Sequence, residues 1–119
     1  MKYLALLYDN EGSGPNPGTP EFTEMMAAYQ AAGEIFEKDK VFVAGEALQP
    51  TNAATSIKVR NGKTETMDGP FAETKEQLGG FYVFECDNID QAIKYASLIP
   101  AAKTGTIEIR PIMDLSKLG

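Results

Sequence analysis

Two segments whose side chains are apolar in both directions constrain the fold more than any other feature of this chain. Successive side chains of a β-strand point to opposite faces of the sheet. The strands predicted over residues 2–8 and 80–86 carry apolar side chains at both sets of positions. A strand of this kind lies in the middle of a sheet, with both of its faces covered.

Helix and strand signals alternate along the rest of the chain. Thr19-Pro20-Glu21 is typical of a helix start, and Asp87-Asn88 is a second start signal. The first helix has an apolar stripe at Phe22, Met25, Met26, Tyr29, Gly33 and Phe36. The second has one at Ile89, Ala92, Ile93, Ala96 and Ile99, and Pro100 stops it. Short strands are expected at residues 41–44 and 106–112.

A β-hairpin is predicted between these elements. Asn61-Gly62 separates strand-like residues 55–60 and 63–67 by two positions, which favours a type I′ turn. The turn places Lys58 opposite Glu65. It also places two cations, Arg60 and Lys63, opposite each other, which indicates a solvated tip.

The order strand, helix, strand, hairpin, strand, helix, strand predicts an α+β, ferredoxin-like fold, a split βαβ with an inserted β-hairpin, over a single domain of residues 1–119. Both helices of such a fold cover the same face of the sheet. The central strands would then expose an apolar face, which a second subunit can cover. We therefore expect a homodimer packed sheet to sheet.

Composition excludes several classes of function. The chain has no histidine, which removes Ser-His-Asp and Cys-His catalysis and the usual histidine zinc sites. Proton transfer would have to use Asp, Glu, Lys, Tyr or Arg. The net charge of −6 disfavours direct nucleic-acid binding. Cys86 is the single cysteine and is expected in the core.

No cofactor, metal or membrane contact is predicted. The loop at Gly12-Ser-Gly14 lacks the glycine spacing of a dinucleotide site. No stretch approaches the length of about 20 apolar residues that spans a bilayer. The apolar run at residues 3–8 is not followed by a cleavage site for a signal peptide, so a cytoplasmic location is expected.

Four motifs carry a resemblance to a known family: Met1-Lys-Tyr-Leu, residues 45–50 (Gly-Glu-Ala-Leu-Gln-Pro), residues 68–80 beginning Asp-Gly-Pro-Phe, and Glu108-Ile-Arg-Pro. Together they resemble the YCII-related proteins, in particular the subgroup named for its DGPF motif. The resemblance implies a dimeric α/β barrel of ferredoxin-like subunits. It also implies an association with sigma-factor-linked regulation, because subgroup members often occur beside extracytoplasmic-function sigma factors.

The resemblance does not supply a reaction. Some YCII-like relatives are regarded as small-molecule enzymes that use a His–Asp pair, and this chain has no histidine to form one. Many subgroup members have a histidine before the last strand, where this chain has residues 102–105, Ala-Lys-Thr-Gly.

Asp68 and Glu46 are the candidate catalytic residues. Asp68 precedes Gly69-Pro70, so its carboxylate could hold the turn by accepting backbone N–H groups, or could act as an acid, base or ligand anchor. Glu46 follows a small, apolar stretch. It is either partly buried, which suits acid–base chemistry, or exposed at the surface.

Phe71, Glu73 and Arg110 are the candidate ligand-binding residues. Phe71 either fills the core or lines a ligand pocket. Glu73 belongs to a charged run that is either a solvated surface or part of a polar site. Arg110 either pairs with Asp68 or Glu46, or holds the carboxylate of a ligand.

Two functions remain open from the sequence. The first is a small-molecule enzyme, or a former enzyme, of lyase or isomerase type that uses these carboxylates. The second is a non-catalytic dimeric module for ligand binding or regulation. A purely structural role for the motif is a third reading.

Overall fold

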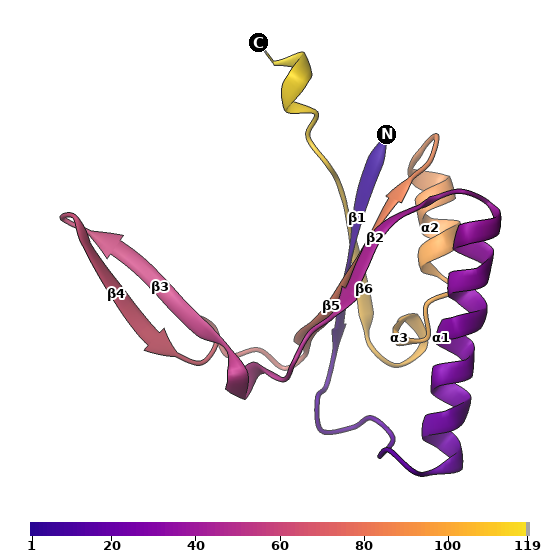
Figure 1. The fold of residues 1–119 in the computed structure, drawn as a ribbon, viewed down its shortest axis with the longest axis horizontal. Coiled ribbons are helices and arrows are strands. Elements are labelled where there is room, and N and C mark those ends of the chain that lie inside the picture. Colours follow the sequence, from indigo (N-terminus) through magenta and orange to yellow (C-terminus); the bar gives the residue numbers. More distant parts are fainter. Residues whose placement is uncertain (119) are drawn as a thin grey trace.

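The computed structural model describes residues 1–118. It consists of a four-stranded sheet with helices on one face and a separate two-stranded hairpin that extends from the other side (Figure 1). The elements in chain order are β1 (Lys2–Asp9), α1 (Pro20–Lys38), β2 (Phe42–Ala47), β3 (Thr55–Arg60), β4 (Lys63–Asp68), β5 (Gln77–Glu85), α2 (Ile89–Ala96), α3 (Ala101–Thr104) and β6 (Thr106–Pro111), with short 3-10 turns at Thr51–Ala53 and Leu115–Lys117.

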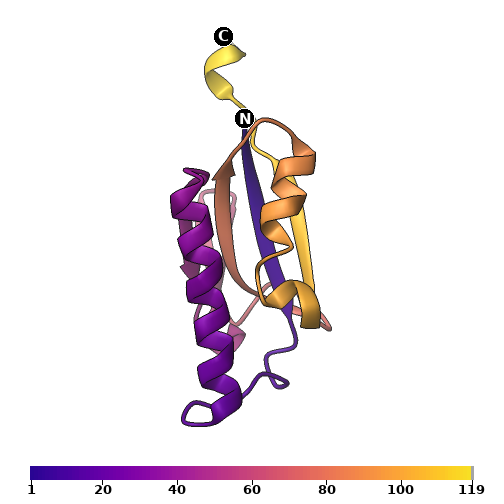
Figure 2. The same ribbon diagram turned by 90° about the vertical axis from the view of Figure 1, so that its right-hand side faces the viewer.

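The sheet has the strand order β2-β5-β1-β6, and every neighbouring pair is antiparallel. β1 and β5 are therefore the central strands, as their apolar residues on both faces predicted. α1 and α2 lie side by side over one face (Figure 2). The predicted α+β, ferredoxin-like architecture with an inserted hairpin is confirmed.

Local signals place the helix starts and the hairpin turn where the sequence predicted them. The Thr19 hydroxyl accepts a hydrogen bond from the Phe22 N–H (3.2 Å), and the Asn88 side chain accepts one from the Gln91 N–H (3.0 Å). Asn61 and Gly62 have φ angles of 52° and 77°, as a type I′ turn requires. The predicted register is also confirmed, with Lys58 opposite Glu65 and Arg60 opposite Lys63.

An aromatic cluster fills the space between the sheet and the helices. The side chains of Phe36, Phe84 and Ile99 are fully buried. The Phe36 ring centroid lies 5.5 Å from that of Tyr82, 4.9 Å from that of Phe84 and 6.1 Å from that of Tyr95. All three contacts are edge-to-face, the arrangement that aromatic pairs favour.

Some residues of the predicted helix stripes do not reach this core. Met26 is 50% exposed, and Ala32 is buried instead, because helical periodicity places residues 22, 25, 29, 32 and 36 on one face. Ile89 and Ile93 are 42% and 48% exposed. The core position on α2 is taken by Tyr95, and α2 ends at Ala96, before Ile99.

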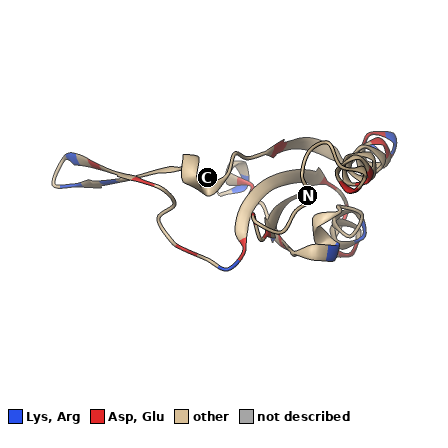
Figure 3. Ribbon diagram, turned by 90° about the horizontal axis from the view of Figure 1, so that it is seen from below, with Lys and Arg blue, Asp and Glu red and all other residues tan. Residues whose placement is uncertain are grey.

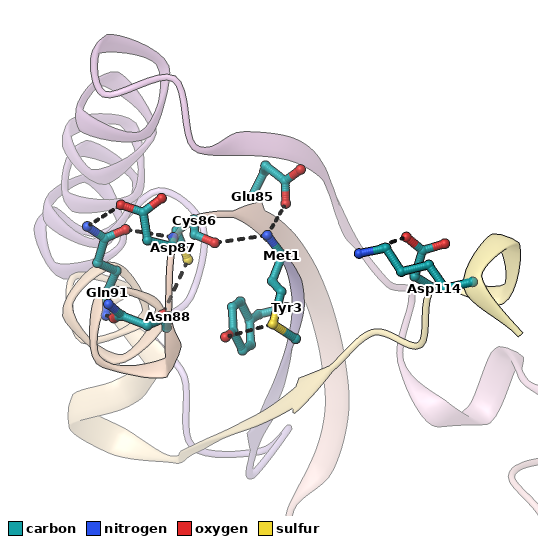
Figure 4. Close-up of polar contacts among 9 residues, drawn as sticks. Met1, Tyr3, Glu85, Cys86, Asp87, Asn88, Gln91 and Asp114 are labelled. Carbon is teal, nitrogen blue, oxygen red and sulfur yellow. Dashed lines mark hydrogen bonds and ion pairs between the residues drawn. The ribbon is translucent and has the colours of Figure 1, made fainter.

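The chain's first residue is held at one end of the sheet (Figure 4). The Met1 ammonium group donates to the Cys86 carbonyl (3.2 Å) and pairs with the Glu85 carboxylate (3.1 Å). Cys86 is buried, as predicted, and its burial raises the pKa of the thiol. A thiol held protonated in this way is a poor nucleophile, which agrees with a packing role.

The core tyrosines predict a loss of stability in alkali. Burial raises the pKa of Tyr29 and Tyr82 above 10.0, and a hydrogen bond to Asp39 (2.8 Å) raises the pKa of Tyr95. A raised pKa in the folded state contributes stability that is complete below pH 10.0 and is lost as the pH rises through the folded-state pKa values.

Denaturant unfolding at pH of about 8 and about 11 should therefore give a lower free energy of unfolding at the higher pH. Tyr95→Phe retains the ring and removes the ionisable hydroxyl, so this variant should lose less stability over the same range. Equal stability of the wild type at both pH values would contradict the prediction.

Candidate functional site

The sheet face opposite the helices remains apolar across its central strands. Leu4 and Leu6 of β1 and Phe81 and Val83 of β5 point to this side and are only half-buried. We call this surface, with the side chains that flank it, the open face. Its apolar area extends over two adjacent strands, so it is a contiguous patch rather than scattered exposed residues.

Two carboxylates and one guanidinium flank the apolar centre of the open face. Glu46 of β2 lies opposite Phe81, and Glu108 of β6 lies opposite Leu6. Residues directly opposite each other in an antiparallel ladder share a face. Arg110 is placed on the same face by its pairing with Leu4. The open face therefore offers apolar area between charged edges.

Arg110 forms its ion pair within its own strand. Its Nε lies 3.9 Å from a carboxylate oxygen of Glu108, and both side chains are largely exposed. Glu46 is on the opposite edge of the sheet, three strand spacings away, which amounts to about 14 Å. Glu46 was one of the two predicted partners of Arg110, and the structure places Glu108 there instead.

The second predicted partner, Asp68, belongs to a different part of the molecule. It ends β4, in the hairpin formed by residues 55–68, which we call the arm. The arm extends away from the sheet on the side of the open face (Figure 1). The predicted site residues are thus divided within one chain, with Glu46 and Arg110 on the open face and Asp68 on the arm.

The turn after Asp68 is held by its neighbours and not by the Asp68 carboxylate. The Gly69 N–H donates to the Ala54 carbonyl (2.7 Å), and the Ser56 hydroxyl donates to the Gly69 carbonyl (2.9 Å). Gly69 has a φ of 92°, a conformation that favours glycine. Among residues 1–118, no group donates a hydrogen bond to the Asp68 side chain, which is exposed at the end of β4.

Phe71 does not fill the core. Its side chain is 81% exposed, because the segment after Gly69-Pro70 runs outside the sheet before it enters β5. The core-filling interpretation is therefore wrong for the single chain. Glu73 lies in the same exposed segment. The strand begins at Gln77, so the last residues of the motif are part of β5.

A groove of about 560 Å³ follows the arm beside Phe71. It is lined by Ser56, Ile57, Lys58, Glu65, Thr66, Met67 and Phe71. The arm side chains Ile57, Val59 and Met67 are each at least half exposed. An isolated two-stranded hairpin has no core to bury such side chains.

A network of polar side chains at the end of β1 was missed by the sequence analysis. Asp9 accepts a hydrogen bond from the Thr104 hydroxyl (2.6 Å), and Glu76 accepts one from the Thr106 hydroxyl (2.9 Å). The first bond ties the end of α3 to β1, and the second ties the loop before β5 to the start of β6. A carboxylate directly after an apolar central strand was the available signal for Asp9.

These features define a small α+β protein with a ferredoxin-like sheet, one apolar open face and a protruding arm. The chain belongs to the YCII-related domain family, whose sequence pattern matches residues 1–116. It is also 35% identical, over 114 residues, to an uncharacterised protein of Rhizobium meliloti (strain 1021). That match covers 94% of this chain and 92% of the relative.

Within residues 1–118, no helix has the length and apolarity to cross a membrane. The chemistry available at the open face is that of two carboxylates and one guanidinium beside apolar surface, and the arm adds the Asp68 carboxylate and the cations of its tip. Such a set can bind an anion and transfer protons.

Proposed function

We propose that this protein is a homodimer that binds a small molecule between the open faces of its two subunits. The observation that carries the proposal is the open face itself, with its apolar centre of Leu4, Leu6, Phe81 and Val83. Two such faces packed against each other would remove this area from water, at a gain of about 25 cal/mol per Å². The same packing would enclose the charged edges.

The enclosed surface favours a ligand with an apolar body and an anionic group. Arg110 supplies the cation that would hold a carboxylate or phosphate, with geometry suited to two parallel hydrogen bonds. Glu46 faces the same side of the sheet and is a candidate proton acceptor. Apolar surface with a few polar groups is the usual composition of a small-molecule site.

The assembly is tested by a charge placed at the centre of the open face. Leu6→Glu should give a monomer at micromolar concentration in sedimentation experiments, because a buried carboxylate without a partner is strongly unfavourable. Ile93→Glu is the matched control, since Ile93 is a 48% exposed side chain on the helical side. A wild-type monomer, or a dimeric Leu6→Glu protein, would contradict the sheet-to-sheet assembly.

Ligand binding is tested with a library of small carboxylates and other anionic metabolites. We expect at least one of them to raise the melting temperature of the wild type. Arg110→Gln should weaken that binding by about tenfold or more, the value of a charge-assisted hydrogen bond. Lys103→Gln removes an exposed cation on α3 and should leave binding unchanged. Equal affinity of Arg110→Gln and wild type would exclude the role of Arg110.

Acid–base catalysis is the second candidate function, and the exposed carboxylate of Asp68 favours it. If a bound metabolite is converted, Asp68→Asn should lower turnover by about 100-fold, because it removes the proton-transfer group and preserves the shape of the side chain. Glu65→Gln is the control, because Glu65 lies three residues before Asp68 on the same strand and faces the other side of the arm. Binding without conversion by the wild type would leave the protein as a binding module.

A further inference from the structure

The arm has no packing partner within its own chain. The ladder of β3 with β4 places Ile57 and Val59 on the same side of the arm as Asp68. Ile57 is 64% exposed and Val59 is 56% exposed. The radius of gyration is 16.6 Å, whereas a compact chain of this length has about 13.5 Å. The arm therefore adds exposed apolar surface that a compact chain would bury.

The arm and the open face are on the same side of the molecule. Figure 1 shows the arm extending from the side of the sheet that carries no helices, and Figure 3 shows it well separated from the sheet. Six residues per strand give the arm a length of about 20 Å, whereas packed sheets are about 10 Å apart. An arm of this length would reach past a second sheet packed on the open face.

The distribution of charge also favours a second copy of this chain as the partner that the arm contacts. Three of the eleven Lys and Arg residues are in the arm tip, as Lys58, Arg60 and Lys63 (Figure 3). Outside the arm (residues 55–68), the chain has eight basic residues and fifteen Asp and Glu residues. The basic tip of one copy would thus meet a partner surface that is acidic overall, which favours association of the two.

We infer that the arm of each subunit packs against the other subunit and contributes Asp68 and Phe71 to a site whose Glu46 and Arg110 belong to that other subunit. This inference rests on the proposed dimer and adds which subunit supplies each residue of the site. In a two-fold dimer both arms make the same contact, so a single arrangement covers the apolar side chains of both arms and both open faces. It also brings Asp68 and Phe71 to an open face, from which they are separated within a single chain.

The contact is tested by a photo-reactive benzophenone amino acid in place of Phe71. A mixture of unlabelled and ¹⁵N-labelled subunits is irradiated, and the cross-linked peptides are analysed by mass spectrometry. We expect cross-links that join one labelled and one unlabelled chain, with attachment at residues 44–46, 81–83 or 108–110 of the other chain. Cross-links confined to one chain, or to the helices of the other chain, would overturn the inference.

The sheet-to-sheet dimer and the arm contact would be refuted by different results. A protein that is a dimer by sedimentation but gives only intrachain cross-links would retain the sheet-to-sheet assembly and refute the arm contact. A wild-type monomer would refute both. Because the benzophenone replaces a side chain that is 81% exposed, the fold does not depend on it.

Charge reversal at the arm tip gives a second test without a cross-linker. Replacing Lys58, Arg60 and Lys63 with glutamate should raise the dimer dissociation constant by about tenfold or more at low salt, with a smaller effect at high salt. The control variant replaces Lys38, Lys94 and Lys103 with glutamate. These are exposed cations outside the arm, so the net charge changes by the same amount. Equal weakening by both triple variants would overturn the arm contact.

Discussion

Phe36→Ala is expected to lower the free energy of unfolding by about 4 kcal/mol, the cost of removing a large aromatic side chain from a packed core. Phe36 is fully buried and its ring contacts Tyr82, Phe84 and Tyr95. These contacts join α1 to β5 and α2, so the cavity would lie where three elements meet. A loss of this size is a large part of the 5–15 kcal/mol that stabilises a typical domain.

Urea unfolding followed by far-ultraviolet circular dichroism measures the effect. Ile35→Ala is the matched control, because Ile35 precedes Phe36 on the same helix and is 39% exposed. It should cost less than about 1 kcal/mol. Similar losses for both variants would show that Phe36 does not hold the core in the way described.

Gly105→Ala should destabilise the protein by about 3 kcal/mol or more, because the new methyl group has no space. A Cβ built at Gly105 would overlap the Tyr8 carbonyl oxygen and would lie 3.0 Å from the Asp9 Cα. Both atoms belong to the backbone of the central strand, so neither can move without disturbing the sheet. The close approach of the two backbones requires glycine at this position.

Gly33→Ala is the control for this substitution. Gly33 is within α1, and a Cβ added there would meet no atom within 4 Å. Because alanine favours helix more than glycine, this variant should be more stable by about 0.5–1 kcal/mol. Thermal unfolding of the two variants should therefore shift in opposite directions, and a Gly105→Ala protein of wild-type stability would contradict the steric argument.

Most of the fold could be predicted because its main determinants are local in sequence. The Asn61-Gly62 turn fixed the arm register, and Thr19 and Asn88 fixed the helix starts, since each signal acts within a few residues. Which side chains of each helix are buried was harder to predict. Met26 was included in a predicted stripe and is half exposed, whereas Tyr95 was left out and is buried. An apolar stripe wider than its contact with the sheet does not show which of its sides is covered.

The candidate site was less predictable because it depends on distances between segments that are far apart in sequence. The alternation of side chains along β6 is local and places Glu108 and Arg110 on one face. The separation of Glu46 from Arg110 follows from the strand order, which sets β2 and β6 at opposite edges. No pattern within a single chain indicates how far the arm carries Asp68 and Phe71 from the sheet.

The place of β1 at the centre of the sheet has a consequence for biosynthesis. β1 is made before both of its partner strands, since Lys2 pairs with Glu85 and Tyr3 with Pro111. At ribosomal rates of about 5–20 residues per second, roughly 4–15 s pass between the synthesis of β1 and that of β5. During that interval an apolar strand has no partner in the nascent chain. β1 is therefore a binding segment for chaperones that hold short apolar stretches until β5 has been translated.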